Sequence, residues 1–188
     1  MMKRSFIFTL SLFALCAGLF AKGDTYTYDY WSKIEKSPDV YSVSHVVYAD
    51  DLKLDVPLKN PGNLYCKGNT LFVLDTDNNR IIELEYTPER VLKFRRVIDR
   101  FYSNGQVLET FNGPKDMFIT EDGCYFIADT NNGRVLKLDK DLNYIFSLVE
   151  PDDPTYQKGK EFLPEKVVAD VKGRAYVLSK NVNKGFIK

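Results

Sequence analysis

The chain has 188 residues, of which 26 are basic and 26 acidic, and 44% are hydrophobic. This balance lacks the positive footprint that nucleic-acid-binding domains need. His45 is the single histidine, which excludes a zinc site made of clustered histidines and a histidine-based catalytic triad.

The first 21 residues indicate a secretory signal peptide. The start is basic, Ser5–Phe20 is almost wholly apolar, and small residues lie near Ala21. The apolar stretch of 16 residues is short for a membrane-spanning helix, and no comparable stretch follows. We therefore predict cleavage after Ala21, a secreted or cell-surface protein, and no transmembrane segment in the mature chain. Lipidation at Cys16 is the alternative, disfavoured because a large leucine precedes that cysteine.

Cleavage removes two basic residues and no acidic one, which leaves 24 basic against 26 acidic residues and a formal charge of −2. We expect no nucleic-acid partner for a nearly neutral domain of this kind.

Residues 22–58 form an N-terminal extended segment that precedes the repeats. Tyr26, Tyr28, Tyr30 and Trp31 alternate with small or polar residues, which predicts a strand with the tyrosines on one face and Trp31 on the other. One interpretation is a latch that packs on the following domain and covers an edge strand. The other is a stacking platform that binds a ring-shaped ligand such as a sugar.

Residues 59–188 contain three copies of one strand–turn–strand unit. The copies open at Pro61, Pro114 and Pro164, 53 and 50 residues apart, a spacing typical of propeller blades. In the clearest copy, residues 111–146, four short apolar runs are separated by turns rich in Asp, Asn and Gly, which predicts an antiparallel meander. A single meander cannot bury both of its faces, so the three copies predict stacked blades of a β-propeller.

The segment between the first two copies, residues 86–110, is too long for a hairpin connection. We expect it to complete the outer part of the first blade and then to turn at Asn104-Gly105.

A polar turn recurs at the same place in the first two copies. Its members are Asp75, Asn78 and Arg80 in the first copy and Asp129, Asn132 and Arg134 in the second. An aspartate accepts backbone N–H bonds in tight turns, and an arginine can tie the turn to carbonyl groups or to the next blade. Because a catalytic residue need occur only once, the repetition favours a structural role. We predict no catalytic residue, no metal ligand and no cofactor. The third copy has Ser179 and Lys184 in place of the Asp and the Arg.

The turn sequences ADTNNGRV at 128–135 and DTDNNRI at 75–81 resemble the NHL repeat. This resemblance covers roughly residues 59–188 and implies an all-β fold, an NHL-type β-propeller. The aromatic opening before the repeats is similar to that of secreted bacterial NHL-repeat proteins found alongside sugar-uptake transporter components. Such propellers generally have about six blades, so about three blades imply an incomplete propeller, the N-terminal part of a longer one.

These observations predict a noncatalytic binding or scaffold propeller outside the cell, with a carbohydrate or protein partner and, by resemblance, a link to sugar uptake. The alternative is a propeller enzyme, a lactonase-like hydrolase or a lyase, with metal ligands beyond residue 188. After signal removal Cys66 and Cys124 remain. We predict them to be unpaired and mostly buried, because the repeat alignment places them on different strands.

Overall fold

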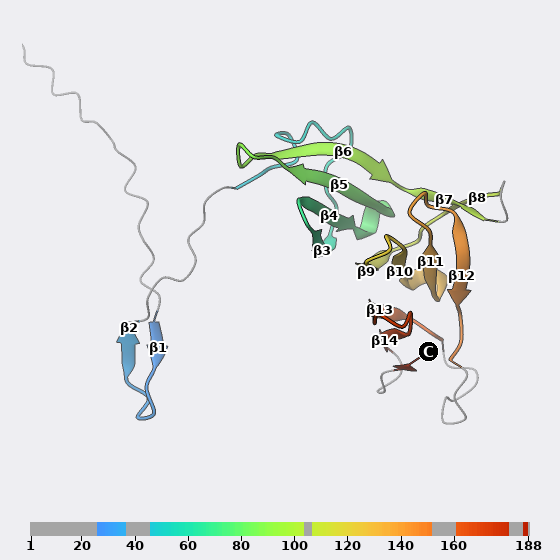
Figure 1. The fold of residues 1–188 in the computed structure, drawn as a ribbon. Helices are drawn as coiled ribbons and strands as arrows, with labels where there is room; N and C mark the ends of the chain where they lie inside the picture. Colours follow the sequence, from blue (N-terminus) through green and yellow to red (C-terminus); the bar gives the residue numbers. More distant parts are fainter. Residues whose placement is uncertain (1–25, 37–45, 104–106, 152–160, 181–185, 188) are drawn as a thin grey trace, which may run out of the picture. The chain divides into compact units, whose positions relative to one another are not determined.

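The computed structural model describes residues 26–36, 46–103, 107–151, 161–180 and 186–187 (Figure 1). The chain divides into one unit that ends at Val46 and a second that begins at Val47. The signal peptide predicted for residues 1–21, with Cys16, lies outside the described residues, as do His45 and Lys184.

The described part of the first unit is a two-stranded hairpin. Strand β1 (Tyr26–Tyr28) pairs antiparallel with β2 (Ile34–Lys36), and Thr27 lies opposite Glu35. The strand predicted for residues 26–31 thus ends at Tyr28, and a turn follows it.

The second unit contains three antiparallel sheets in which the strands follow in chain order. Blade 1 consists of β3 (Pro61–Lys67), β4 (Thr70–Asp75), β5 (Arg80–Tyr86) and β6 (Leu92–Ile98). Blade 2 consists of β9 (Pro114–Ile119), β10 (Tyr125–Asp129), β11 (Arg134–Leu138) and β12 (Tyr144–Leu148). Blade 3 consists of β13 (Pro164–Ala169), β14 (Ala175–Ser179) and β15 (Phe186–Ile187).

Smaller elements join these sheets. The short 3-10 helices η1 (Thr76–Asn78) and η2 (Thr130–Asn132) lie in the two polar turns. Strands β7 (Arg100–Ser103) and β8 (Val107–Thr110) pair with each other between blades 1 and 2. In the described residues, no helix is long and apolar enough to cross a membrane.

The first strands of successive sheets contact one another, β3 with β9 and β9 with β13, and the sheets succeed one another as blades (Figure 1). This is the arrangement of a β-propeller. The all-β propeller class that the sequence predicted is therefore confirmed, and the described residues include three of its blades.

Blade 2 buries both faces because it has a neighbouring blade on each side. Side chains on β10 alternate between the faces, so that Phe126 and Ala128 pack toward blade 3, where they meet Val177. Ile127, between them, packs toward blade 1 against Leu74. This explains why β10 is an unbroken run of buried residues rather than an alternating one.

Residues 47–58 cover the face of blade 1 that does not pack against blade 2. Leu52 is buried there against Val73, Ile82 and Leu84. The N-terminal segment predicted as residues 22–58 therefore divides between the two units, and its second part belongs to the core of blade 1.

The thiols of Cys66 and Cys124 are both free, and their predicted burial is wrong. Cys66 is exposed and Cys124 is half-buried. The reason is that Cys66 lies on β3, the first strand of its sheet, whose alternate positions face away from the interior.

Candidate functional site

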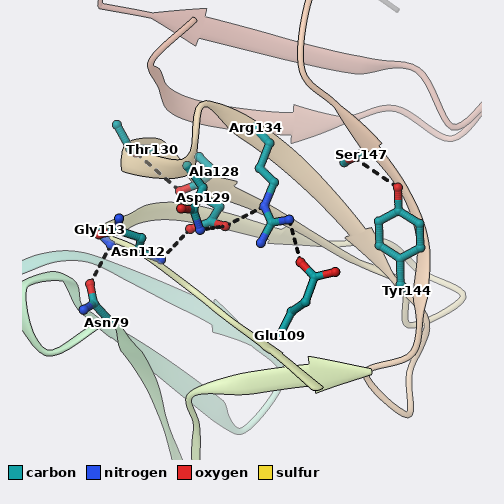
Figure 2. A network of polar contacts seen from close by, with 11 residues as sticks. Asn79, Glu109, Asn112, Gly113, Ala128, Asp129, Thr130, Arg134, Tyr144 and Ser147 are labelled. Atoms are coloured by element: carbon teal, nitrogen blue, oxygen red, sulfur yellow. Dashed lines mark hydrogen bonds and ion pairs between the residues drawn. The ribbon is translucent and has the colours of Figure 1, made fainter. Parts of the chain in front are cut away.

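Asp129, at the end of β10, is the centre of a polar network (Figure 2). Its carboxylate is fully buried and accepts hydrogen bonds from the backbone N–H of Asn112 at 2.7 Å and the side-chain amide of Asn132 at 2.8 Å. The Nε of Arg134 donates to it at 2.8 Å, and Nη1 of the same arginine donates to Glu109 at 2.8 Å. The buried charge of Asp129 is thus compensated by one cation and two neutral donors.

Asp75 has the same surroundings in blade 1. It accepts hydrogen bonds from the backbone of Lys59 at 2.7 Å, from the amide of Asn78 at 2.8 Å and from Nε of Arg80 at 2.7 Å. The Nη2 of Arg80 donates to the carbonyl of Val56 at 2.6 Å, where Arg134 instead meets a carboxylate. The six predicted turn residues are therefore brought together as two equivalent networks.

The polar turns also contact the next blade. The hydroxyl of Thr76 donates to the carbonyl of Pro114 at 2.9 Å, and that of Thr130 donates to the carbonyl of Pro164 at 2.6 Å. In addition, the side-chain oxygen of Asn79 accepts the N–H of Gly113 at 2.7 Å (Figure 2). Each turn thus positions the first strand of the blade that follows.

In the third blade, a serine takes the place of the aspartate in this turn. The hydroxyl oxygen of Ser179 accepts the N–H of Leu163 at 3.1 Å, in the role of one carboxylate oxygen of Asp75 or Asp129. Nothing in these contacts points the turn residues toward a ligand, so their structural role stays our prediction.

The aromatic residues of the hairpin lie differently from the prediction. Tyr26 and Tyr28 are on β1, whereas Tyr30 and Trp31 lie in the turn that follows. Because Asp29 accepts the N–H groups of Trp31 and Lys33, each at 2.8 Å, the chain turns instead of extending.

This turn brings two of the four predicted binding residues together. The rings of Tyr30 and Trp31 pack edge to face, with their centroids 5.0 Å apart. The side chains of Tyr28, Tyr30 and Trp31 are 60%, 91% and 75% exposed. The expected placement of Trp31 on the face opposite Tyr30 is therefore wrong, since that alternation holds only in an extended strand.

A groove between blades 2 and 3 was not predicted from the sequence. It has a volume of about 400 Å³, and its lining includes Thr120, Asp122, Lys137, Asp170 and Val171. Two hairpin turns form its rim. The signal that could have found it is a pair of turn glycines, Gly123 and Gly173, which are 50 residues apart like the prolines of the same blades.

In the described part of the chain, no group of three or more His, Cys, Asp and Glu side chains is placed to hold a metal ion.

Acidification should weaken the network of Asp129 through Glu109. Hydrogen bonds from Arg134 and then from Ser103 lower the pKa of Glu109, because they favour its charged form. The pKa of Glu109 is therefore lower in the folded protein than in the unfolded chain, where a glutamate has a pKa of about 4.3. Such a carboxyl stabilises the folded state fully at pH values above the unfolded-state pKa, and this contribution is lost as the pH falls through the folded-state pKa. We expect Glu109→Gln to lower the unfolding free energy at pH 7 and to change it little at pH 3, measured by urea denaturation. An equal loss at both pH values would contradict this assignment.

No protein-family model and no curated protein sequence matches the chain. Solved structures do resemble it. A streptogramin B lyase is 14% identical over 86% of this chain and 43% of its own, with a TM-score of 0.42. An auxiliary nutrient binding protein from Bacteroides thetaiotaomicron is 10% identical over 85% of this chain and 41% of its own, with a TM-score of 0.45. A virginiamycin B lyase from Staphylococcus aureus is 12% identical over 85% of this chain and 72% of its own, with a TM-score of 0.40. The chain thus spans less than half the length of the first two, and at these identities the similarity concerns the fold alone.

Proposed function

We propose that this chain is part of a noncatalytic binding propeller that acts outside the cell and binds a carbohydrate through its aromatic hairpin. The apolar start of the sequence supports a secreted or cell-surface location. The NHL-type repeat and a link to sugar uptake belong to the same proposal. The equivalent networks around Asp75 and Asp129 support the repeat assignment.

The exposed ring pair of Tyr30 and Trp31 carries this proposal. Large aromatic side chains usually bury most of their surface, whereas these two lie together on a turn that Asp29 holds in shape. The apolar face of a sugar ring stacks on such rings, and the phenol and indole N–H groups can bond its hydroxyls. A protein partner that covers the same rings is the competing outcome.

Trp31 is the only tryptophan of the chain, so its fluorescence reports on the hairpin directly. We expect a cognate mono- or oligosaccharide to shift or quench this emission saturably, with a Kd between micromolar and millimolar. By calorimetry, Tyr30→Ala should weaken binding about fivefold, since one stacked ring contributes about 1 kcal/mol.

The matched control is Tyr102→Ala, which removes a tyrosine that is 49% exposed on β7. It should leave sugar affinity unchanged. If no saccharide of a broad panel alters Trp31 emission or produces heat, the carbohydrate proposal fails and a protein partner takes its place.

A further inference from the structure

We propose that the groove between blades 2 and 3 is a second carbohydrate subsite, which takes a neutral sugar ring with an N-acetyl or methyl substituent. The inference rests on the proposed carbohydrate-binding function but uses a different part of the chain.

Two equivalent turns make the rim rigid. In Thr120–Cys124 and in Asp170–Arg174 the N–H of the first residue bonds the carbonyl of the fifth, both at 3.0 Å. The fourth residue of each turn, Gly123 or Gly173, has a positive φ of 88° or 78°, which glycine adopts without strain. The groove is therefore largely preformed, as small-molecule sites usually are, and its volume of about 400 Å³ lies in their range.

Three carboxyl side chains, those of Glu121, Asp122 and Asp170, and one ammonium, that of Lys137, line the groove. Arg174 pairs with Asp170 at 2.6 Å, while Asp122 accepts a hydrogen bond from the hydroxyl of Thr120. A hydrogen bond from the Thr120 hydroxyl lowers the pKa of Asp122, and one from the Arg174 backbone lowers the pKa of Asp170. Both carboxyls are therefore charged acceptors at neutral pH. The ammonium of Lys137 adds donors to the same groove.

This lining favours a neutral ligand with hydroxyl groups. A hydroxyl donates to a carboxylate and accepts from an ammonium, so a polyol can use both kinds of group. An anion would be repelled by the three carboxylates, and a cation would leave the ammonium of Lys137 without an acceptor. Phe118, Ala169 and Val171 add apolar surface, against which the C–H face of a sugar ring can pack. Val171 is 97% exposed, so this surface is open to solvent.

A smaller apolar pocket explains the expected substituent. Gly173 borders both the groove and this pocket, which has a volume of about 80 Å³ and is otherwise lined by Phe126, Val135, Phe146, Leu148 and Ala175. The ammonium of Lys137 lies 5.2 Å from the ring centroid of Phe126 and 5.7 Å from that of Phe146, so it marks the polar side of the pocket. A methyl group is apolar and small enough to enter such a pocket, and its burial should strengthen binding several-fold.

Selective labelling of the mature chain with ¹⁵N-glycine gives one amide signal for each of its ten glycines, the 11 of the full sequence less Gly18 of the predicted signal peptide. Titration with N-acetylglucosamine should shift the signals of Gly123 and Gly173 saturably and leave those of Gly62 and Gly68, on blade 1, in place. Glucose should produce the same shifts with several-fold lower affinity. Unmoved Gly123 and Gly173 signals overturn the subsite, and equal affinities of the two sugars overturn the role of the apolar pocket.

Val171→Asp should weaken the N-acetylglucosamine affinity read at Gly173 at least tenfold, because it replaces apolar surface of the groove with a charge. Val149→Asp is the matched control, since Val149 is also exposed but does not line the groove, and it should leave the affinity unchanged. An equal effect of both variants would overturn the subsite. Trp31 emission, followed in the same titrations, separates the two proposals: glycine shifts without a tryptophan response would contradict the hairpin site, and the reverse would contradict the groove.

Discussion

Asp129→Ala is expected to lower the free energy of unfolding by about 3 kcal/mol. The substitution leaves the guanidinium of Arg134 without its buried partner and removes the acceptor of two further donors, Asn112 and Asn132. Breaking a buried ion pair from one side costs about 3–5 kcal/mol, and the bond that Arg134 keeps to Glu109 places the loss near the lower limit. Denaturant unfolding of the full chain measures it.

Asp139→Ala is the matched control for this experiment. Asp139 also accepts three hydrogen bonds, from the backbone of Asp141 and from the backbone and side chain of Asn143. Because these bonds are exposed to water, we expect a loss of at most about 1 kcal/mol. Sugar affinity of folded Asp129→Ala protein should equal that of the wild type. Lost affinity with an unchanged unfolding curve would show that Asp129 belongs to a binding site and would contradict its structural role.

Phe101→Ala is expected to lower the unfolding free energy by about 3–5 kcal/mol, the range for truncating a buried phenylalanine. Phe101 is fully buried, although it lies on β7 in the connection between blades 1 and 2. Its ring stacks on Phe111 with the centroids 5.6 Å apart, and the guanidinium carbon of Arg134 lies 5.4 Å from its centroid. The substitution should therefore loosen both the apolar core and the network of Asp129.

Tyr102→Ala is the control for this experiment, because it also removes an aromatic ring from β7, but one that is not buried. The Tyr102 side chain is on the opposite face of the strand and half exposed, so its truncation should change the unfolding free energy by less than about 1 kcal/mol. Equal losses for the two variants, measured by denaturant unfolding, would contradict the placement of Phe101 in the core.

Features that depend on a few neighbouring residues could be predicted from the sequence alone. The glycine turns are encoded locally, because glycine adopts a positive φ. The Asp-Thr-x-Asn turns are local in part: the side chains of Asn132 and Arg134 bond Asp129 three and five residues before them, whereas the backbone N–H that Asp129 accepts belongs to Asn112. Together with the spacing of Pro61, Pro114 and Pro164, this chemistry was sufficient for the blade, its polar turns and the propeller class. The turn at Asp29 has the same local origin, but the alternating aromatics around it favoured a strand.

Which surfaces are covered, and which face one another, depends on the packing of whole elements and could not be predicted from the sequence. The burial of Leu52 and Phe101, and the exposure of Cys66, depend on which element packs against each face of a blade. The groove likewise exists because Asp122 and Asp170, 48 residues apart, belong to hairpin turns of adjacent blades. Local turn chemistry acts over about five residues. Burial and the meeting of distant side chains depend instead on how complete blades stack.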